Sequence, residues 1–192
     1  MMNRQVNFNK TKYVTFAFAL LWASAFMGKA IAQTAQLPAT CPAGIPETAN
    51  DADFLLLPAG EILHIASNLV FMRCSIGQTW NGNTCAGEPS AHSWQQALQI
   101  SQNTSFNDSL NWRLPNIKEL SVITERACVR PSINDTLFPN TSPDDYWTST
   151  PSMLDENSAW AISFTNASNA LKLKERSLFL RMVRTRLPSE SL

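Results

Sequence analysis

The chain has 192 residues, with 15 basic and 15 acidic side chains that give a formal net charge of +0. Four of the basic side chains and none of the acidic ones lie in residues 1–32, so the remaining 160 residues carry a net charge of −4. An acidic remainder argues against nucleic acid as a partner. Its length is sufficient for one domain with its own core.

The N-terminus has the three parts of a secretory signal peptide. Basic side chains stand between residues 4 and 12, an apolar run covers residues 14–26, and residues 30–32 read Ala-Ile-Ala, a small-residue cleavage site. The apolar run is short for a membrane span, although an uncleaved anchor is the alternative. We predict that residues 1–32 are removed and that the product is exported, to the periplasm or to the cell surface, without stable membrane insertion.

The next segment, residues 33–53, reads as an N-terminal arm that contains proline and alanine. Residues 61–65 and 69–73 read as two short strands joined at Ala66-Ser67-Asn68, a predicted β-hairpin. We expect the domain to cover residues 54–187 and a short tail to cover residues 188–192.

All four cysteines follow the predicted leader, and an even number in an exported chain suggests two disulfides. Four cysteines allow three pairings. Cys74 and Cys85 bracket a turn-rich loop, which favours a local bridge, and Cys41 would then tie the arm to Cys128. The rival is a metal site, but the chain has no C-x-x-C and its two histidines are not at ligand-like spacing, so no metal site is predicted.

Two helices are predicted from their first turns. Ser93 can cap a helix with Gln96 at the third position, and Asn116 can cap a second helix in the same way, which is the capping-box pattern. The second helix follows a strand-like run at residues 111–114 that a proline ends. Apolar residues at helical spacing extend this helix to residue 127.

Strands dominate the second half of the chain. Residues 146–150 and 159–164 are strand-like, with Trp160 on the apolar face of the second run. Residues 171–174 and 178–184 predict a terminal hairpin. Helices followed by a run of strands indicate an α+β fold.

Seven sequence blocks resemble the bacterial DUF1566 family, also called the Lcl C-terminal domain, from about residue 69 to residue 184. In chain order they are C-S-I-G-Q-T-W-N-G-N-T-C (74–85), S-W-Q-Q-A-L (93–98), N-W-R-L-P-N-I-K-E-L (111–120), P-S-I-N…F-P (131–139), Y-W-T-S-T (146–150), A-W-A-I-S-F (159–164) and R-M-V-R (181–184). The resemblance implies a C-type-lectin-like fold, with two helices and small twisted antiparallel sheets. The chain departs from the family pattern at residues 67–73 and at the turn 166–169, where Asn-Ala-Ser-Asn replaces the usual glycine.

Catalysis is not predicted. A nucleophile needs a neighbouring base, and the chain has two histidines and no G-x-S-x-G. The resemblance also points to formylglycine-generating oxidases, which need reactive cysteines at a copper site. Here the cysteines are better explained as disulfides, so an oxidase is the third choice.

The resemblance implies a ligand site on the irregular loops between the second helix and the last strands. Carboxylates and amides beside an aromatic face suit a sugar, and the predicted ligand-binding residues are Asp135, Asn140, Asp144, Asp145, Tyr146 and Trp147. The carboxylates could also hold calcium; the alternative is a solvated acidic loop, and no other cofactor is expected.

A basic strip near the C-terminus offers an alternative surface, which would accept a sulfated glycan. It consists of Lys172, Lys174 and Arg176, continued by Arg181, Arg184 and Arg186. The alternative is the solvated face of a terminal hairpin. Of the tryptophans after the leader, Trp94, Trp112 and Trp160 are expected in the core. For Trp80 and Trp147 both core packing and stacking on a sugar are kept as alternatives.

The sequence therefore predicts a secreted, non-catalytic binding domain that recognises a glycan or a cell-surface protein, as an adhesin does. The alternative is a structural accessory subunit of a bacterial surface appendage. An adhesin binds its ligand as an isolated monomer, whereas an accessory subunit copurifies with a larger assembly.

We expect the exported protein to begin at Gln33, because Ala30 and Ala32 are small enough for signal peptidase. N-terminal sequencing of the exported protein measures this directly. Recovery of Met1 on the exported chain would show that the apolar run is retained as an anchor.

Overall fold

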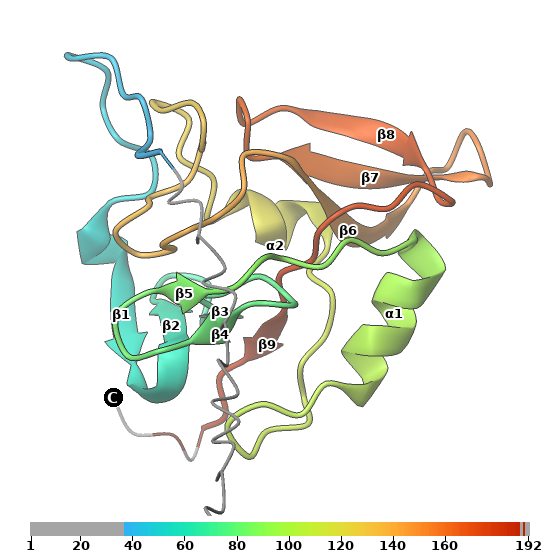
Figure 1. Ribbon diagram of the computed structural model, residues 1–192, viewed down its shortest axis with the longest axis horizontal. Coiled ribbons are helices and arrows are strands. Elements are labelled where there is room, and N and C mark those ends of the chain that lie inside the picture. The colour runs from blue at the N-terminus through green and yellow to red at the C-terminus, as the bar shows by residue number, and fades with distance from the viewer. Residues whose placement is uncertain (1–36, 189, 191–192) are drawn as a thin grey trace, which may run out of the picture. The chain divides into compact units, whose positions relative to one another are not determined.

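The computed structural model describes residues 37–188 and residue 190 (Figure 1). The predicted leader, residues 1–32, and the first residues of the arm lie outside the described residues. Within the described part, no helix is both long enough and apolar enough to cross a membrane.

In the part of the chain that the structure describes, three antiparallel sheets and two α-helices make up the domain (Figure 1). A four-stranded sheet has the order β1-β2-β3-β9, with β1 Phe54–Leu57, β2 Glu61–His64, β3 Leu69–Met72 and β9 Val183–Thr185. A three-stranded sheet has the order β6-β7-β8, with β6 Asp145–Pro151, β7 Ser158–Ser163 and β8 Asn169–Leu173. A small pair joins β4 Thr79–Trp80 to β5 Cys85–Ala86, and the helices are α1 Trp94–Asn103 and α2 Ile117–Ser121.

This architecture confirms the predicted α+β class with two helices, small antiparallel sheets and two disulfides. The disulfides pair Cys74 with Cys85 and Cys41 with Cys128, as predicted. The more specific comparison with C-type lectins stays a prediction.

The local sequence signals are confirmed. Ser93 and Gln96 form a capping box at α1, and Asn116 does the same at α2. In the β2–β3 hairpin, His64 pairs with Leu69 across a turn whose last residue, Asn68, has a φ of 54°. Asparagine adopts this left-handed conformation more readily than most residues, so the turn suits its sequence.

The second helix is shorter than predicted and ends at Ser121. Ile123 and Ala127 are buried as expected, but they lie beyond the helix. After the helix, Thr124 bridges to Ile133, so the chain turns into a strand-like pairing before the predicted helix end. A strand-like pairing with the segment that follows has thus replaced the last predicted helical turns.

The predicted terminal hairpin is wrong. β8 pairs with β7, whereas β9 pairs with β3 in the other sheet. The connecting segment is buried at Leu178, Leu180, Arg181 and Met182. A segment covered on both sides lies inside the domain, so it could not form the solvated edge of a hairpin.

The burial of the tryptophan side chains differs in part from the expectation. Trp112 is 3% exposed and Trp147 is 0% exposed, so both are core residues. Trp94 and Trp160 are only partly buried, and the prediction that Trp160 is core is corrected. On β7 the small side chains of Ala159 and Ala161 face the core instead.

Arg181 is fully buried and forms no ion pair with a carboxylate of the described residues. Its guanidinium donates to the carbonyls of Met72 and Arg73, and to the hydroxyls of Ser75 and Thr141. Burial lowers the pKa of Arg181 to about 10, so the group remains a cation at neutral pH.

We expect Arg181→Lys to destabilise the fold by about 2–4 kcal/mol. An ammonium has three donors and no planar fork, so at least one of the four buried acceptors loses its partner, at about 1–3 kcal/mol each. Urea unfolding measures the difference. The matched control is Arg176→Lys at an exposed position, and an equal effect of both changes would contradict the role of Arg181.

Candidate functional site

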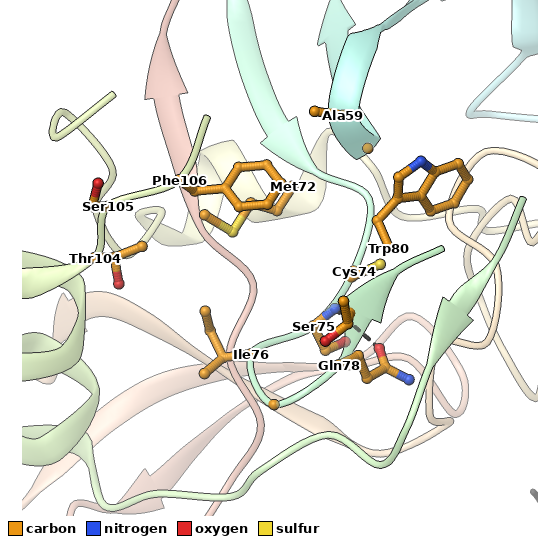
Figure 2. Close-up of a pocket in the computed structure, with 13 residues that line it drawn as sticks. Ala59, Met72, Cys74, Ser75, Ile76, Gln78, Trp80, Thr104, Ser105 and Phe106 are labelled. Atoms are coloured by element: carbon orange, nitrogen blue, oxygen red, sulfur yellow. Dashed lines mark hydrogen bonds between the residues drawn. The ribbon is translucent and has the colours of Figure 1, made fainter. Parts of the chain in front are cut away.

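A cleft of about 450 Å³ opens between the disulfide loop and the segment that follows α1 (Figure 2). We call it the Trp80 cleft. Its apolar walls include Met72, Ile76, Trp80 and Phe106, and its polar lining includes Thr79 and Ser105. Such a volume is typical of sites that bind small groups.

Trp80 is positioned by two contacts. A Cβ added to Gly60 would lie 2.5 Å from Trp80 Cγ, so only glycine allows this close approach. The guanidinium of Arg73 lies 4.2 Å from the centroid of the Trp80 ring, a cation–π contact. Arg73 is itself fixed, because its Nε donates to Leu137 O at 2.7 Å.

The disulfide loop is held in one conformation. The bridge closes the loop, and Gln78 Oε1 accepts from Ser75 N at 3.1 Å. Gln78 Nε2 donates to Asn140 O at 3.0 Å, and Asn140 Nδ2 donates to Cys85 O at 2.8 Å. This wall of the cleft is therefore formed before any ligand arrives.

The opposite wall is fixed to the core by Phe106. Its ring packs edge-on against Trp112, with centroids 5.9 Å apart, and its carbonyl accepts from Trp112 Nε1 at 3.1 Å. Thr104, next to this wall, donates to Ile100 O at the end of α1. Phe106 and Ser105 lie in a polar stretch of the sequence that is typical of a loop. The isolated phenylalanine in this stretch is the sequence feature that indicates a buried contact there.

The chemistry of the Trp80 cleft is that of an apolar, uncharged surface. None of its lining residues carries a charge. Most of its polar side chains are already used: Gln78 holds the loop, Thr104 bonds α1, and Ser75 Oγ contacts Tyr146 Oη at 3.0 Å. An incoming group would therefore meet apolar side chains and few available hydrogen-bonding atoms.

Two residues of the predicted ligand loop have structural partners instead. Asp135 Oδ2 accepts from the backbone of the arm at Ala39 N, 2.9 Å away. Asn140, with a φ of 56°, holds the disulfide loop through Cys85. Both side chains stabilise junctions between segments far apart in the sequence.

The two neighbouring aspartates differ in their surroundings. Asp144 is exposed, and its Oδ1 accepts from Asp145 N at 2.7 Å. Asp145 forms an ion pair with Lys172 at 2.6 Å. The structure thus joins one residue of the predicted loop site to one residue of the rival basic strip.

Tyr146 and Trp147 have no exposed surface, which corrects the expectation that they form an aromatic face for a ligand. Trp147 Nε1 donates to His92 O at 2.9 Å, and burial raises the pKa of the Tyr146 phenol. Among residues 37–188 and 190, no three His, Cys, Asp or Glu side chains are grouped as metal ligands. Calcium binding stays a prediction without a located site.

The basic strip does not form one solvated face. Arg181 and Arg184 are buried, and Arg184 pairs with Glu61 at 2.5 Å and with Glu190 at 2.7 Å. Lys174 lies 4.6 Å above the Trp94 ring and donates to a backbone carbonyl. Arg176 is exposed.

A second, more polar hollow of about 370 Å³ lies where the arm meets the loop after α2. Its polar groups hold the arm in place: Glu125, only 2% exposed, accepts from the N–H groups of Thr48, Ala49 and Ala127. Asn134 in turn donates to Asp51 at 2.7 Å. The hollow is the seam at which the arm docks.

Burial by itself would raise the pKa of Glu125, but the N–H donors of Ala49, Ala127 and Thr48 outweigh it and lower the pKa below 4.5. A depressed folded-state pKa gives stability that is present above the unfolded pKa and lost as pH falls through the folded value. We expect the arm to loosen below about pH 4. Amide hydrogen exchange of Thr48 and Ala49 measures this.

The control for that experiment is Glu125→Gln, which removes the titrating group. Its exchange should be faster than in the unmodified protein at pH 6 and should lack the acid-induced increase of Thr48 and Ala49. The same pH dependence with and without the carboxylate would assign the effect to another group.

Comparison with models of protein families identifies a match. The family model described as the Lcl C-terminal domain matches residues 60–184, which is more than half of the chain. A search of curated proteins gave no match. The matched region contains nearly all of the Trp80 cleft, whereas β1 and Cys41 precede it.

Proposed function

Since this chain belongs to the Lcl C-terminal domain family, we propose that it is an exported, non-catalytic domain that binds a protein partner through the Trp80 cleft. Two disulfides support export, because such bonds persist in oxidising compartments. The paired cysteines also leave no free thiol among the described residues for oxidase chemistry.

The observation that carries the proposal is the apolar, uncharged lining of the cleft. A sugar hydroxyl that enters such a site loses its hydrogen bonds to water and finds few replacements, which is unfavourable. An apolar side chain loses nothing comparable and gains from burial. The cleft therefore suits an apolar anchor residue of a protein, the kind of group that dominates many interfaces.

Absence of catalysis is part of the proposal and is supported by the surroundings of the histidines. His64 Nδ1 lies 2.7 Å from Ser67 Oγ, and His92 Nε2 lies 2.9 Å from Ser90 Oγ. Each pair is separated by three residues or fewer, as in a local turn contact. None of these four residues is among those that line the Trp80 cleft.

Glycan recognition is the second candidate, and it would have to use the exposed Asp144 loop. Tyr146 and Trp147 are buried in the core, so they do not form the exposed aromatic face that the predicted sugar site requires. Stacking on an aromatic face is a large part of what a sugar site needs, so we place glycan binding after protein binding.

To test the proposal, we would replace Thr79, an exposed residue of the cleft, with a photo-crosslinking aromatic residue in producing cells. We expect adducts with a protein. Filling the cleft with Ser105→Trp should lower their yield at least about tenfold, the effect of losing about 1.4 kcal/mol. The control position for the photo-crosslinking residue is Asn166, exposed on the β7–β8 turn.

Equal adduct yields at Thr79 and Asn166 would contradict a specific role of the cleft. So would glycan binding that Asp144→Ala abolishes and Ser105→Trp leaves intact. Either result would move the binding site to another surface.

A further inference from the structure

The strand β8 is the outer strand of the three-stranded sheet, with β7 on one side of it and no described strand on the other (Figure 1). In an antiparallel pair, every second residue points its N–H and C=O away from the neighbouring strand. The N–H of Lys174 donates to Asn157 O at 2.8 Å at the end of the β7–β8 pairing. Alternation from this bond turns the backbone of Asn169, Leu171 and Leu173 outward.

The outward backbone groups of β8 form an unpaired row. Within residues 37–188 and 190, no segment bonds to the N–H or C=O of Leu171, to the C=O of Asn169 or to the N–H of Leu173. The C=O of Leu173 accepts from Arg176 N at 3.0 Å in the turn that follows the strand. Such a row is a template for an extended strand, because another backbone offers donors and acceptors at the same spacing.

Lysine side chains commonly guard such an edge, but Lys172 and Lys174 are turned back onto their own domain. Lys172 reaches across β7 to Asp145 on β6, with an ion pair of 2.6 Å. Lys174 lies 4.6 Å from the centroid of the Trp94 ring and donates to Glu156 O at 2.6 Å. Neither ammonium group is therefore placed to repel a second strand.

Apolar side chains flank the edge on one face of the sheet. Leu171 and Leu173 project on the same face because strand side chains alternate, and they are 37% and 47% exposed. Trp160, opposite Leu171 on β7, is only partly buried. A strand that pairs with β8 would therefore also cover apolar surface, which adds to the backbone hydrogen bonds.

The sequence of β8 makes this strand complementary to itself. In an antiparallel pair centred on Leu171, the two copies of Leu171 lie opposite each other and exchange both backbone hydrogen bonds. The N–H of each Leu173 then meets the C=O of Asn169 in the other copy, so donors meet acceptors along the row. On the other face Lys172 lies opposite the uncharged Ala170, so like charges do not face each other directly.

We propose that β8 of one copy pairs antiparallel with β8 of a second copy, centred on Leu171, and joins the two sheets into one continuous sheet. The contact uses the same patch on both copies and closes on itself, so the product is a two-fold dimer. No residue of β8 lines the Trp80 cleft. The dimer therefore does not rest on the function proposed for that cleft.

Sedimentation velocity of the exported full chain over a range of concentrations measures the dimer. Leu171→Glu and Leu171→Lys each place two like charges directly opposite each other and remove an apolar pair. Each variant alone should associate at least about tenfold more weakly than the unmodified chain, the factor expected from losing the burial of one leucine. Because Leu171 is exposed, both variants should keep the far-UV circular dichroism of the unmodified chain.

An equimolar mixture of the two charge variants is the decisive measurement. Glutamate on one copy then faces lysine on the other, so mixed dimers should form at least about threefold more tightly than dimers of either variant alone. An isotope label on one variant lets native mass spectrometry count the mixed dimers.

The matched control is Leu56→Glu on β1, the outer strand of the four-stranded sheet, where the leucine is 55% exposed. This variant should dimerise as the unmodified chain does. Ser105→Trp, which fills the Trp80 cleft, should also leave the dimer unchanged. Adducts of the chain with itself in the photo-crosslinking experiment are identified by their mass, so the dimer and the partner of the cleft are counted separately.

A chain that stays monomeric at about 1 mM would overturn the proposal, since even a weak contact is populated there. So would a mixture of charge variants that associates no better than either variant alone, because residue 171 then does not face its own copy. Loss of the dimer in Leu56→Glu, with the dimer of Leu171→Glu intact, would assign the contact to the edge of β1 instead.

Discussion

The buried guanidinium of Arg181 is the interaction on which the rest of the structure depends. It joins the end of β3 to the disulfide loop and to the loop at Thr141, which are otherwise separate segments. Carbonyl and hydroxyl oxygens replace the carboxylate that usually accompanies a buried cation. Removal of the guanidinium would take a charged hydrogen-bond donor away from each of these oxygens, so the segments around it would lose their common anchor.

The same group connects the core to the Trp80 cleft. Met72 and Ser75 accept hydrogen bonds from Arg181 and also line the cleft. Ser75 contacts Tyr146, whose ring packs edge-on against Phe164 with centroids 4.8 Å apart. The cleft is therefore built on the interior of the domain, and its shape does not depend on a mobile surface loop.

Recognition by this domain would use surfaces that are already formed. The disulfide loop is fixed by Cys74–Cys85 and Gln78, and β8 is fixed by its pairing with β7. Preformed surfaces avoid the entropy cost of ordering on binding, so a modest apolar contact can still give useful affinity.

Sequence alone determined the features whose causes lie within a few residues: the capping boxes of Ser93 and Asn116, the β2–β3 hairpin and the local Cys74–Cys85 bridge. Tertiary structure decided the burial of Arg181, whose acceptor Met72 is 109 positions away, and the pairing of β9 with β3. It also decided that Trp147 is core and that Phe106 lines a cleft. Local pattern shows which side chains are apolar or charged; only the packing of distant segments determines which of them are covered.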